Sequence, residues 1–228
     1  MFKPVKNGVA ALSLGIAAIV GVTAPAQAAT VYESVTHTNQ DTGDYSIYDQ
    51  RYFGAGFTLN QATTITAIGG EFDNIAGNIF GAIVALPSAG GLPSFSPTQL
   101  AANALAHVVF TGSGSATDQS APLSLTLAAG NYAVIFGGDS QFAGADGTAG
   151  MTVDNDLIGS PNIFQYFGLV YGDKWTHDSV YDGLRFFVEG TPAGSVPEPA
   201  TWAMMILGIG MVGGALRRRT LAGALSRA

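Results

Sequence analysis

The sequence predicts an all-β protein: a single antiparallel β-sandwich or jelly-roll-like domain, flanked by an N-terminal signal-peptide helix and a C-terminal transmembrane helix. Short runs rich in β-branched and aromatic residues alternate with clusters of Gly, Pro, Asn, Asp and Ser. Residues 64–68 and 123–127 alternate with period two, as half-buried strands do. Many short strands with hardly any helical pattern favour a sandwich or jelly roll.

The predicted strands follow one another through the middle of the chain. They cover residues 55–59, 63–72, 79–86, 105–111, 123–127, 132–136, 163–170 and 184–189. The Ala-Ala-Gly-Asn sequence at 128–131 predicts a tight hairpin between two of these strands. Residues 98–106, just after Ser96-Pro97, are the helix candidate of this region, and we expect that helix to be short or absent.

The N-terminal residues 1–28 have the three parts of a secretory signal peptide. Lys3 and Lys6 give a positive start, residues 9–22 form an uncharged apolar run, and Ala26-Gln27-Ala28 supplies small residues at the usual cleavage spacing. We expect signal peptidase to cut after Ala28. The alternative is an anchor that is not cleaved.

The C-terminal residues combine an extended motif, an apolar segment and positive charge. The two prolines of Pro197-Glu198-Pro199 disfavour helix and keep the motif extended. Residues 201–216 carry no charge and, as a helix, span roughly 24 Å, which is short of the ~30 Å hydrocarbon core of a membrane. Trp202 at one interface and the following arginines at the other would cover the difference. The alternative, a buried core helix, is disfavoured by the four glycines of this segment.

Arg217, Arg218 and Arg219 should remain in the cytoplasm, because positive flanks resist translocation. The Pro-Glu-Pro motif then lies on the outer side of the inner membrane. We therefore divide the chain into a signal peptide (1–28), a β-domain (29–192), a linker (193–196), a C-terminal signal (197–219) and a cytoplasmic tail (220–228).

This C-terminal segment resembles the PEP-CTERM sorting signal, in the variant with Trp-Ala after the motif. The resemblance rests on Pro197, Glu198, Pro199, Trp202 and the arginine cluster, and departs from the common version at Ile209 and in the longer tail. It implies recognition by an exosortase, a membrane-embedded cysteine transpeptidase-like enzyme of Gram-negative bacteria. It also implies cargo associated with exopolysaccharide and the biofilm matrix.

The charge of the middle region limits its partners. The chain has 9 basic and 16 acidic residues, but only Arg51, Lys174 and Arg185 lie between the two end signals, together with 15 of the acids. The net charge there is near −12, which disfavours nucleic acid as a partner. There is no cysteine, so no disulfide holds the domain and no catalytic thiol is available.

Catalytic patterns are weak. The histidines lack metal-ligand spacing and no Gly-x-Ser-x-Gly elbow occurs. Glu71 and Asp73 would share one strand face and, with Glu189, are candidates for a glycosidase carboxylate pair. The alternative is that these acids are solvated strand ends. We expect no enzymatic activity.

Ligand sites are also predicted only weakly. Asp154 and Asp156 offer oxygen ligands for calcium in a loop, as do Asp41 with Asp44 and Asp139 with Asp146, although Asp and Asn are also common turn residues. We expect no required cofactor.

Tyr171 and Trp175 flank a polar turn and are candidates for stacking on sugar rings; core packing is the alternative for these aromatics.

Together these patterns predict an exported protein that is held briefly in the inner membrane and then released to the outer surface or the medium. We expect a non-enzymatic surface or matrix-associated protein. The alternatives are a module that binds exopolysaccharide and, third, a secreted glycan-active enzyme.

Overall fold

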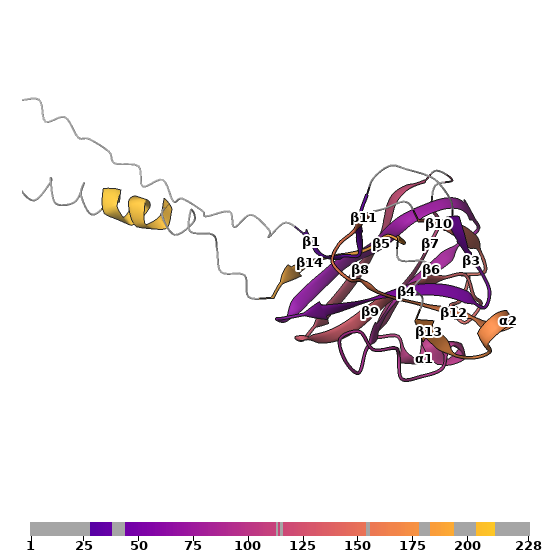
Figure 1. The fold of residues 1–228 in the computed structure, drawn as a ribbon. Helices are drawn as coiled ribbons and strands as arrows, with labels where there is room; N and C mark the ends of the chain where they lie inside the picture. Colours follow the sequence, from indigo (N-terminus) through magenta and orange to yellow (C-terminus); the bar gives the residue numbers. More distant parts are fainter. Residues whose placement is uncertain are drawn as a thin grey trace, which may run out of the picture.

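The computed structural model describes residues 28–37, 44–112, 114, 116–153, 156–177, 183–193 and 204–212. In these residues the chain is mostly antiparallel β-sheet with few helices, which confirms the all-β prediction. The described strands form two six-stranded sheets and one two-stranded sheet (Figure 1).

One six-stranded sheet is centred on the long strand β5 (Thr63–Ala76), and we call it the β5 sheet. Its strand order is β1-β14-β5-β10-β3, and β8 pairs with β5 as well. The other strands are β1 (Ala29–Glu33), β3 (Asp44–Ile47), β8 (Thr117–Leu127), β10 (Thr148–Thr152) and β14 (Phe186–Pro192).

The second six-stranded sheet, the β4 sheet, has the order β13-β12-β4-β9-β6-β7. Its strands are β4 (Arg51–Leu59), β6 (Ile79–Ala85), β7 (Ala106–Phe110), β9 (Gly130–Gly137), β12 (Asn162–Phe167) and β13 (Trp175–His177). The two-stranded sheet pairs β2 (Val35–Thr36) with β11 (Asp156–Leu157). Three short helices connect strands: η1 (Pro97–Gln99), α1 (Leu100–Asn103) and α2 (Gly168–Tyr171).

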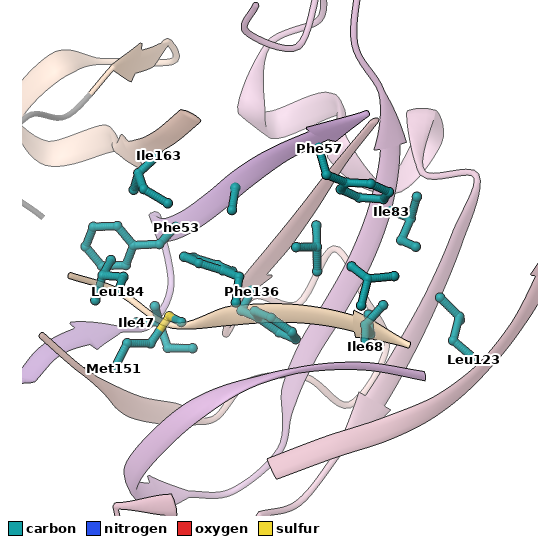
Figure 2. Packing of buried hydrophobic residues seen from close by; sticks show 14 of the residues in the cluster. Ile47, Phe53, Phe57, Ile68, Ile83, Leu123, Phe136, Met151, Ile163 and Leu184 are labelled. Carbon is teal, nitrogen blue, oxygen red and sulfur yellow. The ribbon is translucent and has the colours of Figure 1, made fainter. Parts of the chain in front are cut away.

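The main core contains side chains from both six-stranded sheets, which Figure 2 shows gathered together. Strand β4 illustrates how the sequence builds it. Phe53, Ala55 and Phe57 alternate into this core, while Tyr52 belongs to a second cluster on the opposite face of the strand. Gly54 leaves room on that opposite face, because a Cβ there would lie 2.6 Å from Cζ of Phe164.

The second cluster covers the outer face of the β4 sheet. Tyr52, Phe80 and Phe164 of this sheet pack with Leu100 of α1 and with Trp175, and all are buried. The connection between β6 and β7 adds the partly buried side chains of Leu92, Phe95, Ala101 and Ala104. The β4 sheet is therefore apolar on both faces, which explains why β9 and β6 are almost continuously hydrophobic.

Two local predictions were wrong. The turn at 128–131 does not close a hairpin, because β8 pairs with β5 whereas β9 pairs with β4 and β6. The chain passes from one sheet to the other at this turn. The predicted strand at 163–170 ends at Phe167, and its last residues form α2.

The remaining predicted strands are present, several with longer bounds, and the short helix near residues 98–106 is confirmed. The sequence did not predict the short strands β1, β2, β3, β10, β11 and β13.

Within the predicted transmembrane segment, residues 204–212 are helical, while 201–203 and 213–216 lie outside the described residues. No helix in the described part of the chain is long and apolar enough to cross a membrane.

Candidate functional site

The predicted processing sites adjoin the ends of the β-fold. Ala28 is described and exposed; Ala26 and all the predicted sorting residues (Pro197, Glu198, Pro199, Trp202, Arg217, Arg218 and Arg219) lie outside the described residues. Strand β14 ends at Pro192, and the next backbone N–H, that of Ala193, donates a 2.7 Å hydrogen bond to the carbonyl of Ala62. The hydrogen-bonded fold thus continues to within four residues of Pro197.

The first and last strands of the fold pair with each other. β1 is antiparallel to β14, with Ala29 opposite Gly190 and Thr30 opposite Glu189. The residue after the predicted signal-peptidase cut and the residues before the C-terminal motif therefore lie side by side in the β5 sheet (Figure 1). Both ends of the fold are held by a ladder of backbone hydrogen bonds.

The helix at 204–212 exposes apolar side chains. Met204, Ile206 and Ile209 are each about two-thirds exposed or more (71%, 67% and 69%). Such a surface is unusual for a helix in water and is typical of one that meets lipid or another apolar partner.

The two predicted sugar-stacking aromatics have different surroundings. Trp175 is buried among Tyr52, Phe164 and Tyr166, and its indole N–H donates a 2.9 Å hydrogen bond to the carbonyl of Phe95. Tyr171, on α2, is 47% exposed. The structure therefore leaves the ring of Tyr171 open to a ligand, and it places Trp175 in the core, the alternative that the sequence left open.

Among the described residues, none of the predicted calcium ligands belongs to a group of three possible metal ligands, and Asp41 lies outside these residues. Asp154 lies outside them, and Asp156 is exposed on β11, opposite Thr36 of β2. Asp146 is exposed, whereas Asp139 is buried.

Asp139 instead belongs to an acidic cluster at the edge of the second apolar cluster. The Tyr52 hydroxyl donates a hydrogen bond to Oδ2 of Asp139, and Oδ1 accepts one of 2.7 Å from the backbone N–H of Gln141. Burial, and then this hydrogen bond, raise the pKa of Tyr52, so its hydroxyl remains a donor. Partial desolvation, and then the charge and hydrogen bond of Asp139, raise the pKa of Asp49. The carboxyl group of Asp49 therefore keeps its proton more readily than an isolated aspartate does.

A second set of charges lies at the ends of β1, β8 and β14. Nε and Nη2 of Arg185 donate hydrogen bonds of 2.6 and 2.9 Å to the two carboxylate oxygens of Asp118. Nη1 donates to Glu33 and to the carbonyl of Val35. Burial alone would lower the pKa of Arg185, but the hydrogen bonds that it donates to Asp118 and Glu33 outweigh this effect and raise the pKa. The guanidinium therefore stays charged although only 9% of the side chain is exposed.

Glu71 lies beside this set and is not a solvated strand end. Its side chain is 2% exposed, and its Oε2 lies 3.2 Å from Nδ1 of His37. Asp73, two residues along β5, bonds with the backbone and side chain of Asn74 instead. Sequence reasoning missed that His37 and Asp118 lie beside Glu71 and that Arg185 holds Asp118, because these residues lie far apart along the chain and share no motif.

The chain is an all-β protein with a C-terminal sorting motif. Residues 195–219 match the PEP-CTERM protein-sorting motif, so the predicted resemblance is confirmed over these residues. Among curated proteins, none matches this chain.

Some solved structures show a distant likeness. A structure of the T13 particle of infectious bursal disease virus is 11% identical with a TM-score of 0.26, covering 88% of this chain and 50% of that one. The T=1 particles derived from the same virus give 12% identity and a TM-score of 0.27, covering 88% and 51%. The chain thus spans about half the length of these proteins. Likenesses at this level carry no argument about fold or function.

The PEP-CTERM motif supports an exported protein that is sorted by an exosortase, with transit through a membrane-anchored state.

Proposed function

We propose that this protein is exported, non-enzymatic cargo: a β-sandwich destined for the cell surface or extracellular matrix, whose C-terminal signal is cut by an exosortase-type enzyme. The observation that carries the proposal is the sorting motif at residues 195–219, directly after the last strand of the fold. The other expected partners are signal peptidase and, before processing, the inner membrane.

The position of the motif supports cleavage without damage to the fold. The last strand ends at Pro192 and the hydrogen bond of Ala193 is the last described contact before the motif. A cut near Pro197-Glu198-Pro199 therefore removes no residue of either six-stranded sheet. The exposed apolar helix at 204–212 would be separated from the domain by the same cut.

The pairing of β1 with β14 supports a domain that stays folded after both cuts. The new N-terminus at Ala29 and the new C-terminus would both extend from strands that are hydrogen-bonded to each other. Termini tied into a sheet resist fraying and proteolysis. This arrangement suits a protein that must persist outside the cell without disulfides.

The carboxylates support a non-enzymatic role. Asp49 and Asp139 are in hydrogen-bond contact, closer than the about 5 Å that separates the carboxyl groups of a retaining glycosidase. Both carboxylate oxygens of Asp118 accept hydrogen bonds from Arg185. Each of these acids has a structural partner, and none depends on a substrate to be satisfied.

Polysaccharide binding is the second candidate, and one observation favours it. Helix α2 exposes Leu169, Val170 and Tyr171 together at the surface (75%, 58% and 47% exposed). An exposed tyrosine beside apolar side chains is a suitable platform for a sugar ring. Trp175 is buried in the core, so its ring would not stack on the ligand.

The experiment compares Glu198→Gln with Glu189→Gln in the native host. The two variants make the same change in charge, but Glu198 lies in the motif and Glu189 in strand β14. We expect E198Q to accumulate as uncut protein in the membrane fraction, and E189Q to be processed like the wild type, as seen by immunoblots of membrane and medium fractions. Normal release of E198Q would contradict the sorting role of the motif.

A further inference from the structure

Three side chains with metal-binding atoms converge at one end of the β5 sheet. His37 follows β2, Glu71 lies in β5 and Asp118 lies in β8, so three separate segments meet there. One ligand atom from each, an imidazole nitrogen and two carboxylate oxygens, lie within 4.8 Å of one another.

The two carboxylates occupy directly opposed positions on neighbouring strands, Glu71 of β5 against Asp118 of β8. Like charges in such a pair repel unless a cation lies between them. The Glu71 side chain is 2% exposed, so water screens this repulsion poorly. A positive charge close to both oxygens would therefore stabilise the folded state.

Carboxylates outnumber the one arginine, Arg185, in the described part of this cluster. Its guanidinium is shared between Asp118 and Glu33, so three carboxylates stand against one arginine in the described part of this cluster. A divalent cation beside Glu71 and Asp118 would be attracted by this excess of carboxylates.

The orientation of His37 favours the cation. Its Nδ1 is enclosed by protein and lies 3.2 Å from Oε2 of Glu71 and 3.9 Å from Oδ1 of Asp118, yet it makes no hydrogen bond with the described residues. The nitrogen is thus close to both carboxylates but is not aligned for a hydrogen bond with either. Two ligands about 2.1 Å from a tetrahedral Zn²⁺ are about 3.4 Å apart, close to these separations.

We propose that His37, Glu71 and Asp118 form a binding site for a divalent transition metal ion of the Zn²⁺ type. An imidazole with two carboxylates suits such an ion better than calcium, which prefers oxygen ligands only. Arg185 holds the carboxylate of Asp118 in place from the outside, as hydrogen-bonding partners of metal ligands do. The ion would tie the segment after β2 to two strands of the β5 sheet, a cross-link in a chain without cysteine.

The test is zinc titration of the purified full chain in detergent, after dialysis against EDTA, with calorimetry and thermal unfolding as readouts. We expect a single Zn²⁺ to bind and to raise the melting temperature, because the ion binds the folded state. His37→Ala should weaken binding by at least about 100-fold, because losing a ligand costs more than losing an outer partner.

His177→Ala is the matched control, since His177 is exposed on β13 of the β4 sheet, whereas Glu71 and Asp118 lie in the β5 sheet. It should bind zinc like the wild type. If H37A fails to fold, His37→Gln and Glu71→Gln replace it. Absence of zinc binding to the wild type, or equal affinity in H37A and H177A, would overturn the proposal.

Discussion

The two six-stranded sheets share one core, but away from this core the β4 sheet buries apolar side chains and the β5 sheet buries charged ones. The outer face of the β4 sheet packs apolar side chains, with Phe80 of β6 and Leu100 of the β6–β7 connection both fully buried. The β5 sheet buries charged side chains: Arg185 contacts the carboxylate of Asp118, and Glu71 lies beside His37. An apolar cluster tolerates neighbours of many kinds, whereas each buried charge requires a specific partner.

This difference indicates which region is most sensitive to which kind of change. In the apolar cluster the cost of a substitution follows the volume that is lost. In the charged cluster the cost of a substitution depends on whether it leaves a buried charge without its partner, even when the side-chain volume hardly changes.

The largest effect is expected for Phe80→Ala in the apolar cluster. Phe80 is fully buried and its ring centroid lies 5.2 Å from that of Tyr52 and 4.4 Å from that of Phe142. We expect a loss of about 4 kcal/mol in the free energy of unfolding, measured by urea denaturation. Leu169→Ala, at a side chain that is 75% exposed, is the control and should change stability by less than about 0.5 kcal/mol. Similar values for the two would mean that this face is not a true core.

A slightly smaller effect is expected for Arg185→Met, which keeps the length of the side chain and removes its charge. The change leaves Asp118 and Glu33 without their partner, and we expect a loss of about 3 kcal/mol. The loss is no larger because water screens both acids, whose side chains are about one-third exposed (36% for Asp118 and 32% for Glu33). Lys174→Met removes an exposed charge and serves as the control. If R185M were as stable as K174M, the charged cluster would contribute nothing to the fold.

The smallest effects concern two aspartates near Tyr166, whose pKa is raised by burial and then by the charges of Asp173, Asp139 and Asp49. The pKa of Asp49 is raised, so its protonated form stabilises the fold at acid pH, and this contribution is lost as the pH rises through the raised value. Asp49→Asn should therefore be more stable than the wild type at pH 7, by less than about 1 kcal/mol, with the gain vanishing below about pH 4.

Asp173 should behave with the opposite sign. Burial would raise its pKa, but hydrogen bonds from Thr98 and Ser96 outweigh it and lower the pKa, so its ionised form stabilises the fold above the unfolded pKa. Asp173→Asn should lose stability at pH 7, and the loss should shrink as the pH falls through the lowered pKa. Thermal unfolding of both variants between pH 3 and pH 7 distinguishes the signs, and a gain for D173N would contradict this account.

The sequence predicted those parts of the fold that depend on local pattern. Strands β4, β5 and β9 were found because their residues alternate or form apolar runs between turn residues. The turn at 128–131 was recognised as a turn, but its residues carry no information about which sheet the next strand joins, so the hairpin was wrong. That choice depends on contacts made far along the chain.

The candidate sites show the same limit. The sorting motif is a contiguous pattern and was found from residues 197–219 alone. Trp175 contacts Phe95, and the side chain of Glu71 lies beside His37, and neither partner is close in sequence. A single sequence shows an acid or an aromatic residue, but not the distant segment that covers it.

The central claim is that the chain is cut at both ends around an intact β-domain. The most direct measurement is the intact mass of the protein in the membrane and medium fractions of the native host. The account predicts a released form that begins at Ala29 and ends close to Pro197-Glu198-Pro199. A released protein that still carries Ala228 would contradict it.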